Sequence, residues 1–330
     1  MQRIASLAKS TVLASVLAAT ALYPVISLGQ SGGAPLPKMI TIVVPVEPGA
    51  SNDIFARLLG QKLAARVGST VVVENRPGAS SVIGTEYVSR APADGSVLMI
   101  MGPAFTSIAA VQPKLPYDPV KGFAQVAMLA GGPHILAVSI DSPYKTTAQL
   151  FDAARASKGK LTYGSTGIGS SQHLNTVRLN SMAGSEMTHI PFKGGGSAVI
   201  SLIGGHIDVM LFSYPTLMPH VKSGKVRALA VTSASRSRFA PDLPTLSETI
   251  PGFTVQTWWG ILAPAGTPQV VVNRLNAEIR AIVSLPEMRD IFDKEGVDAA
   301  SMTAAEFTAF VHADIDKWRE VTRKFQIVAE

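Results

Sequence analysis

The chain has 330 residues, no cysteine and a formal net charge of +6. No disulfide and no lipid-anchored cysteine can form, so a fold of this size has to be held together by its buried core. The basic excess is scattered and includes no run of Lys and Arg interleaved with aromatic residues, which argues against nucleic acid as a partner. A mild positive field favours small anions as ligands.

Residues 1–29 have the pattern of a secretory signal. Arg3 and Lys9 give the segment a positive start, and an apolar run of helix formers follows over 11–22. Ser27-Leu28-Gly29 places small residues at the two positions that a signal peptidase reads, so cleavage is predicted after Gly29. The mature protein is then expected to be free in the periplasm.

Two alternatives remain for this N-terminal segment. Cleavage after Ala21 is one of them. A membrane anchor is the other, although a spanning helix needs about 20 strongly apolar residues. Here the apolar run is diluted by small and hydroxyl side chains and by Pro24, so the cleaved signal is the prediction.

Strands and helices are predicted to alternate after the signal. The apolar, β-branched run "ITIVVPV" indicates a buried strand over 40–46, and apolar side chains at helical spacing predict a helix from Ser51 or Asn52 to Gly68. The elements predicted next are a strand over 70–75, a short helix over 81–91 and a strand over 96–102. This β-α-β-α-β order predicts a parallel sheet covered by helices.

The same rhythm restarts after a Pro- and Gly-rich stretch over 101–133. The predicted strands lie over 134–140, 160–165, 186–192, 206–213 and 226–233, and the predicted helices over 146–157, 171–183, 197–205 and 215–224. A long strand follows within 253–268. The C-terminal part is predicted to be helical over 269–284, 286–295 and 303–325.

The closing helices need a sheet to cover, and the first sheet is the simplest place for them. The chain would then cross between two lobes twice, near 131–140 and near 252–259. The predicted fold class is therefore α/β, with lobe 1 made of 38–134 and 253–330 and lobe 2 of 135–252. Two lobes joined by two crossing segments can hinge around a cleft.

The stretch "YGSTGIGSSQHL", Tyr163 to Leu174, carries the most informative loop. Its Gly164-x4-Gly169 spacing matches a P-loop, but Ser170 replaces the required lysine, and no third glycine completes a dinucleotide loop. The G-x-S-x-G elbow is also incomplete, and Ser171 and His173 lie two residues apart, so they cannot meet as nucleophile and base. The sequence therefore gives no support for an enzyme.

The loop suits an anion without any charged side chain. It follows a strand and starts a helix, where unpaired N–H groups and the positive end of the macrodipole meet. "VPVEPGASND" repeats this arrangement in the first lobe, and "FKGGGS" starts a third helix at a strand end. Ordinary helix capping by Ser51 and Ser171 is the alternative for each loop alone. Two such loops beyond the carboxyl ends of parallel strands favour a ligand cleft.

Seven stretches between about Lys38 and the C-terminus follow one another in a consistent order: "IVVPVEPGASNDIFARLL", "VVVENRPGASSVIGTEYVSRAPADG", "LTYGSTGIGSSQHL", "IPFKGGGSAVISLIGGHIDVML", "VRALAVTS", "DLPTLSE" and "WWGILAPAGTP". Together they resemble the Bug-type solute-binding proteins of tripartite tricarboxylate transporters. The resemblance implies a type II, Venus-flytrap periplasmic binding protein fold with two interdomain crossings. It also implies a small carboxylate ligand (amino-acid, di- or tricarboxylate, or aromatic acid), held partly through ordered waters.

The resemblance implies that the loops at 48–53 and 165–171 pinch one carboxylate. The predicted ligand-binding residues from these loops and from two further strand ends are Pro48, Gly49, Ala50, Ser51, Asn52, Asp53, Thr106, Ser165, Thr166, Gly169, Ser170, Ser171, Gly194 and Gly195. A first-turn helix acid is the alternative role for Asp53, and a solvated loop lysine is the expected role of Lys193. One of Trp258 and Trp259, which point to opposite faces of a strand, could wall the cleft.

No metal site or cofactor is expected, because the chain has no cysteine and none of its six histidines pairs at i, i+4. The expected function is an extracytoplasmic receptor, acting as a monomer, that delivers its ligand to the membrane permease subunits of a tripartite tricarboxylate-type transporter. A sensor that presents its closed form to a membrane receptor is one alternative, and an enzyme on the same fold is another.

The first loop departs from the family pattern at Ala50. The family usually has Pro-Gly-Gly here, whereas this chain has Pro48-Gly49-Ala50. If that position requires a positive φ, alanine is strained there by about 1 kcal/mol or more. The loop would then be slightly reshaped.

Overall fold

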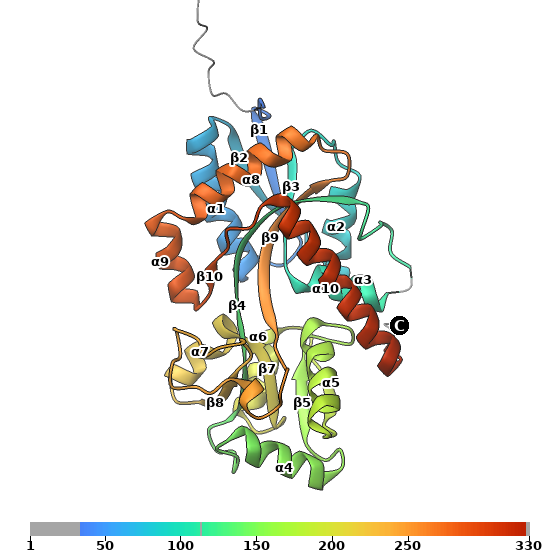
Figure 1. Ribbon diagram of the computed structural model, residues 1–330, viewed down its shortest axis with the longest axis vertical. Coiled ribbons are helices and arrows are strands. Elements are labelled where there is room, and N and C mark those ends of the chain that lie inside the picture. Colours follow the sequence, from blue (N-terminus) through green and yellow to red (C-terminus); the bar gives the residue numbers. More distant parts are fainter. Residues whose placement is uncertain (1–33, 113, 328–330) are drawn as a thin grey trace, which may run out of the picture. The chain divides into compact units, whose positions relative to one another are not determined.

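The computed structural model of the protein describes residues 34–112 and 114–327, which form a two-lobed α/β structure (Figure 1). The predicted signal over 1–29 lies outside the described residues. Among the helices that the structure does describe, none has the length and apolar character to cross a bilayer.

The first lobe is built on three parallel strands. β1 pairs with β2 on one side and with β3 on the other, and β1 and β3 are almost wholly buried. The first helix, α1, ends where Gly68 adopts φ +71° and its N–H bonds back to Ala64. These elements are β1 (Met39–Val44), α1 (Ser51–Val67), β2 (Thr70–Asn75), α2 (Val82–Ser89), β3 (Val97–Met101) and α3 (Pro103–Val111).

Two long antiparallel strands, β4 (Phe123–Ser139) and β9 (Gln256–Pro264), join the lobes. They pair along β9 from Phe123 opposite Pro264 to Pro133 opposite Gln256, and β9 also pairs with β3 in the first sheet. Beyond Pro133, β4 continues into the second sheet, where it pairs with β7 (Val209–Ser213) and β8 (Val226–Val231). These strands are the two crossings of the predicted fold class.

The second lobe has its own parallel strands. β5 pairs with β6 and with β7, and β7 runs antiparallel to β4. The elements are α4 (Thr147–Ser157), β5 (Thr162–Ser165), α5 (Ser171–Ala183), β6 (Thr188–Pro191), α6 (Gly195–Ile203), β7 (Val209–Ser213), α7 (Tyr214–Lys222) and β8 (Val226–Val231).

The strand directions make the loop edges of the two lobes face each other. β4 and β3 both pair antiparallel with β9, so β4 leaves the first lobe in the direction in which β1, β2 and β3 end. β7 and β5 run against β4 and end toward the first lobe. The carboxyl ends of both parallel sets therefore point toward one another, which is where ligands bind in open α/β sheets.

The C-terminal helices return to the first lobe (Figure 1). Leu275 and Ile279 of α8 and Phe292 of α9 join the core around β1 and α1, while Phe307 and Val311 of α10 pack on the other side with β3 and β9. These elements are α8 (Gln269–Val283), α9 (Pro286–Glu295), β10 (Asp298–Ala299) and α10 (Ala304–Phe325).

Several element boundaries differ from the sequence prediction, and three of the differences are informative. The stretch read as a Pro- and Gly-rich connection contains α3, because Pro103 occupies the first turn of that helix, where a missing N–H costs nothing. The strand predicted over 134–140 begins at Phe123, within a run rich in Ala and Gly that lacks a strong strand signal. β1 ends at Val44, before Pro45.

The lobes touch along two seams on either side of the crossing strands. On one side, Val111 of α3, Leu174 of α5 and Trp318 and Val321 of α10 form a buried cluster. On the other side, Arg238 from the second lobe forms ion pairs with Asp293 and Asp298. Gly296 lies so close to Tyr214 there that an added Cβ would stand 2.1 Å from the tyrosine ring.

Candidate ligand-binding site

The starts of α1 in the first lobe and of α5 and α6 in the second lie at the facing edges of the lobes. In the described part of the chain, no acceptor contacts the N–H groups of Ser51, Asn52, Ser171, Gln172 or Gly195. Each helix start also carries the positive end of a macrodipole, equivalent to about half an elementary charge. The site therefore offers donors and positive potential without needing a lysine or arginine.

Asp53 fixes the first loop from inside. Its carboxylate accepts from the N–H of Gly49 at 3.0 Å, from Asn75 at 3.0 Å and from Arg57 at 3.1 Å, and only 5% of the residue is exposed. The bond to Arg57, together with the Gly49 and Asn75 bonds, lowers the pKa of Asp53, although burial opposes this shift. Asp53 therefore acts as a first-turn helix acid, and its carboxylate is not free. Asn75 also donates to the carbonyl of Val46.

Asn52 is held by one of the two strand tryptophans. The indole N–H of Trp259 donates to Asn52 Oδ1 at 3.1 Å, and Trp259 packs edge-on against Phe55 at 5.1 Å. Trp258 faces the opposite side and packs against Phe307. The predicted split between two faces is present, and both rings are buried.

The backbone strain that alanine would have at a positive φ does not occur at Ala50. Ala50 is the N-cap of α1 with φ −72° and ψ 160°, which any residue adopts, and the left-handed position is Gly49 with φ +88°. Pro48, Gly49 and Ala50 are exposed, and the Ser51 hydroxyl has no hydrogen bond within the described chain. The glycine that the turn requires is therefore present.

We expect Gly49→Ala and Ala50→Gly to have opposite outcomes for this reason. An alanine at φ +88° is strained, so Gly49→Ala should lower the free energy of unfolding by about 1–2 kcal/mol. Ala50→Gly should change it by less than about 0.5 kcal/mol, because better N-capping by glycine offsets its backbone entropy. Urea unfolding of both variants measures the difference. An equal cost at both positions would contradict the assigned backbone.

Ser165 braces the second loop and is not free for a ligand. The residue is fully buried, and its hydroxyl donates to Gly167 O and accepts from Gly167 N–H, both at 3.0 Å. It also lies 2.6 Å from His189 Nε2. The predicted ligand contact through the Ser165 hydroxyl is therefore wrong, because all the bonding capacity of that hydroxyl is used inside the loop.

Ser170 and Gly169 define the start of α5. Ser170 Oγ accepts from the N–H of His173 at 3.3 Å as an N-cap, and the N–H of Gly169 donates to His173 Nδ1 at 3.0 Å. Gly169 has φ +76°, and an added Cβ would stand 2.7 Å from Val111 of α3. The second loop therefore rests against the first lobe at this glycine.

Hydroxyl groups remain near the α5 start. Thr166 donates to Gln172 Oε1 at 3.1 Å, and Ser171 donates to the same oxygen at 3.4 Å. Each hydroxyl oxygen can still accept, and the Gln172 amide N–H₂ has no partner within the described chain. These polar groups lie beside the unpaired N–H groups of Ser171 and Gln172.

The α6 start adds a second donor group from the same lobe. Gly194 is its N-cap in an extended conformation, with φ −171°, and no side chain caps it. Gly195 and Gly196 leave backbone N–H groups open, while the Ser197 hydroxyl donates to Gly194 O. Lys193 is exposed.

Thr106 does not belong with these loops. It is fully buried in α3, where its hydroxyl lies 2.5 Å from Asp314 Oδ2 of α10. The prediction that Thr106 lines the pocket is therefore wrong, because α3 turns this side chain toward the helix that covers it. The sequence pattern predicts no helix over 103–111, so it does not give the direction of this side chain.

A strained turn lies at the same edge, after β2. Ala79, Ser80 and Ser81 all have positive φ, at 46°, 54° and 77°. Left-handed conformations of such residues cost about 1–2 kcal/mol each. The Ser81 carbonyl accepts from Thr85 at 2.8 Å, and an added Cβ at Gly84 would stand 2.7 Å from Pro45, so the turn packs against the start of the first loop.

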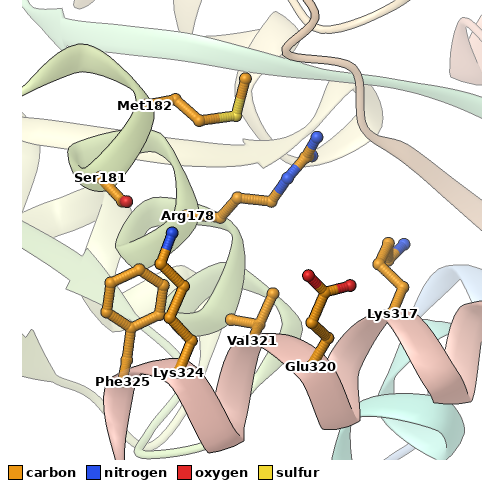
Figure 2. Close-up of a pocket in the computed structure, with 8 residues that line it drawn as sticks. All are labelled: Arg178, Ser181, Met182, Lys317, Glu320, Val321, Lys324 and Phe325. Atoms are coloured by element: carbon orange, nitrogen blue, oxygen red, sulfur yellow. The ribbon is translucent and has the colours of Figure 1, made fainter.

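The predicted residues thus form two groups, one on each lobe, and no hydrogen bond joins them in the described chain. A hollow of 350 Å³ lies elsewhere, between α5 and α10 (Figure 2). It is lined by Arg178, Ser181, Met182, Lys317, Glu320, Val321, Lys324 and Phe325, none of which was predicted to bind ligand. No cluster of three potential metal ligands occurs among residues 34–112 and 114–327.

Sequence reasoning missed His173, His189 and Asn75, which hold the loops from behind. From the sequence, the histidines are considered as metal ligands, and His173 also as a catalytic base, but not as supports for a loop. A signal was present, because β5 and β6 are parallel and place Tyr163 beside His189 directly before the loop. Asn75 ends β2 next to β1, where an amide can reach the first loop.

The fold and the two facing donor groups define a periplasmic solute-binding protein. The family model described as "Tripartite tricarboxylate transporter family receptor" matches residues 55–327, and the chain belongs to this family. BugT of Bordetella pertussis is 30% identical over 86% of this chain and 88% of its own. The predicted Bug-type family and two-lobed fold are confirmed.

Two similar solved structures contain a ligand. Rpa4515 of R. palustris with adipate has a TM-score of 0.79 and 31% identity, covering 88% of this chain and 98% of its own. MatC (Rpa3494) from Rhodopseudomonas palustris with bound malate has a TM-score of 0.76 and 29% identity, covering 86% of this chain and 98% of its own. Adipate and malate are both dicarboxylates.

Proposed function

We propose that the protein is a periplasmic receptor that binds a small carboxylate between the α1 start and the α5 and α6 starts. The observation that carries the proposal is the set of unpaired N–H donors at three helix starts on edges that face each other. The dicarboxylates in two related structures support an anion of this kind. The family description supports delivery to the permease subunits of a tripartite tricarboxylate-type transporter.

The donors in this proposal are neutral. In the first loop they are the N–H groups of Ser51 and Asn52 and the Ser51 hydroxyl. In the second lobe they are the N–H groups that begin α5 and α6 and the Gln172 amide, while the Thr166 and Ser171 hydroxyls donate to Gln172 Oε1 and hold that amide in place. Hydrogen bonds from neutral donors to a carboxylate contribute about 1.5–3 kcal/mol each, so a few of them suffice for micromolar binding.

We place the lobe boundaries at 38–134 with 253–330, and at 135–252. Separate buried clusters support this division, one around β1 and α8 and one around β5, α4 and Leu229. Phe253 and Val255, at the start of the returning segment, still pack in the second cluster. The cleaved signal over 1–29 belongs to the same proposal, because a periplasmic receptor has to be exported.

A melting-temperature series with malate, adipate and their diesters tests the proposal. A bound acid at a hundred times its Kd should add about 2.7 kcal/mol to the free energy of unfolding, which raises the melting temperature. The diesters should give no shift, because they present no anion to the donors. A diester that stabilises the protein as well as its acid would overturn the carboxylate site, and so would a broad carboxylate panel without any shift.

A further inference from the structure

Two histidine rings stack directly behind the second loop. The rings of His173 and His189 have centroids 4.1 Å apart and are 16° from parallel. Tyr163 stacks on His189 at 5.1 Å. The three side chains come from α5, β6 and β5, so the stack joins the strands before the loop to the helix after it.

Each ring holds a different part of the loop. His173 Nδ1 accepts from the N–H of Gly169, and His189 Nε2 bonds to Ser165 Oγ, which holds Gly167. The two rings therefore fix the loop at its start, its middle and its end. The unpaired N–H groups of Ser171 and Gln172 follow immediately.

We propose that His173 and His189 are positioning residues that, as neutral rings, hold the second loop in the geometry that a carboxylate needs. The inference rests on the proposed function for its ligand. Neither ring offers a group to the anion; both act through Ser165 and Gly169.

The bond from Gly169 specifies the protonation state of His173. A ring nitrogen accepts a hydrogen bond only with its lone pair free, so Nδ1 must be unprotonated and the proton must lie on Nε2. A second proton would place two donors, Nδ1–H and Gly169 N–H, against each other. Two charged rings at 4.1 Å would also repel.

The surroundings favour neutral rings. Burial lowers the pKa of His173 to about 4, with a further contribution from His189, and burial also lowers the pKa of His189. Because the unfolded chain binds these protons more readily, stability falls as the pH drops from about 6.5 toward 4. No carboxylate in the described chain forms a hydrogen bond with either ring.

Few titratable groups face the stack from neighbouring elements. Tyr163 lies against it, and the exposed Lys193 follows β6. On α10 the charged groups toward α5 are Lys317, Glu320 and Lys324, which line the hollow beside Arg178. The α3 and β7 segments carry no titratable side chain.

His173→Asn and His173→Leu separate positioning from bulk packing. Asparagine can present Oδ1 near the place of Nδ1, so it keeps an acceptor for Gly169 but cannot be protonated. Leucine fills the space without any acceptor. At pH 7.5, His173→Asn should bind malate or adipate within about threefold of the unmodified protein, and His173→Leu at least about tenfold more weakly. His189→Gln is the equivalent conservative change, and the exposed His206→Gln is the control.

A ligand-free NMR titration gives an independent readout. The His173 ring and the Gly169 amide should titrate together with a midpoint near 4. In His173→Asn the amide should stay near its native position and lose this titration. The proposal would be overturned if the chemical shift of the Gly169 amide did not change as the His173 ring titrates. It would also be overturned if His173→Leu had unchanged affinity and an unchanged Gly169 amide shift. If ring and amide are coupled but no carboxylate binds, the proposed function fails and the positioning role stands.

Discussion

Replacement of Trp318 by alanine is expected to lower the free energy of unfolding by about 3–5 kcal/mol, the range for a buried tryptophan. Trp318 is 1% exposed and packs with Val111, Leu174 and Val321, and its indole N–H donates to Asp314 at 3.2 Å. The truncation would leave a cavity and would remove the bond that Asp314 accepts from the indole. Urea unfolding at neutral pH measures the loss.

Trp318→Phe and Val270→Ala are the matched controls. Phenylalanine restores most of the volume but not the indole N–H, so about half of the loss should return. Val270 is 63% exposed on α8, and its truncation should cost less than about 0.5 kcal/mol. A Trp318→Ala variant as stable as Val270→Ala would mean that the buried cluster does not form.

Asp53→Ala is expected to lower the free energy of unfolding by about 3 kcal/mol and to weaken carboxylate binding by tenfold or more. The carboxylate holds Gly49 and Asn75, and both lose their partner in the variant. The contribution from Arg57 is discounted because its side chain is 53% exposed. Unfolding and ligand titration of the same preparation measure both effects.

The pH dependence gives this variant a second signature. The folded pKa of Asp53 lies below the ordinary value of 3.8, so its stabilisation is present above that pH and is lost as the pH falls through the lower folded value. The difference in the free energy of unfolding between the unmodified protein and Asp53→Ala should therefore be smallest in strong acid. Asp152→Ala removes a 73% exposed carboxylate paired with Arg155 and should cost less than about 1 kcal/mol. Equal losses in the two variants would show that Asp53 does not brace the loop.

The fold was predictable where the residue pattern itself carries the structural reason. The run over 40–46 is apolar and β-branched, and Gly68 ends α1 because a left-handed residue closes the helix. The start of β4 was not predictable in the same way, since Ala and Gly between Phe123 and Gly132 pack between two layers without strong strand propensity.

The sequence predicted where the backbone N–H donors of the candidate site lie, but not which way its side chains point. Helix starts after strands place the N–H donors, and that order can be read from glycines and hydroxyls. Whether a hydroxyl faces the ligand or the loop depends on residues distant in sequence. The Ser165 hydroxyl bonds to His189, which lies 24 residues away in the sequence, and the Thr106 hydroxyl bonds to Asp314, which lies 208 residues away.

The paired strands β4 and β9 determine what kind of motion can join the lobes. The ladder from Phe123–Pro264 to Pro133–Gln256 keeps its hydrogen bonds only if the two strands bend and twist together. The connection therefore behaves as an elastic ribbon with a restoring force, rather than as two independent flexible tethers. Gly131 and Gly132, next to Pro133, lie where the two sheets meet, and an added Cβ at Gly132 would stand 2.8 Å from Val297. Any change in the angle between the lobes therefore has to deform both strands at once.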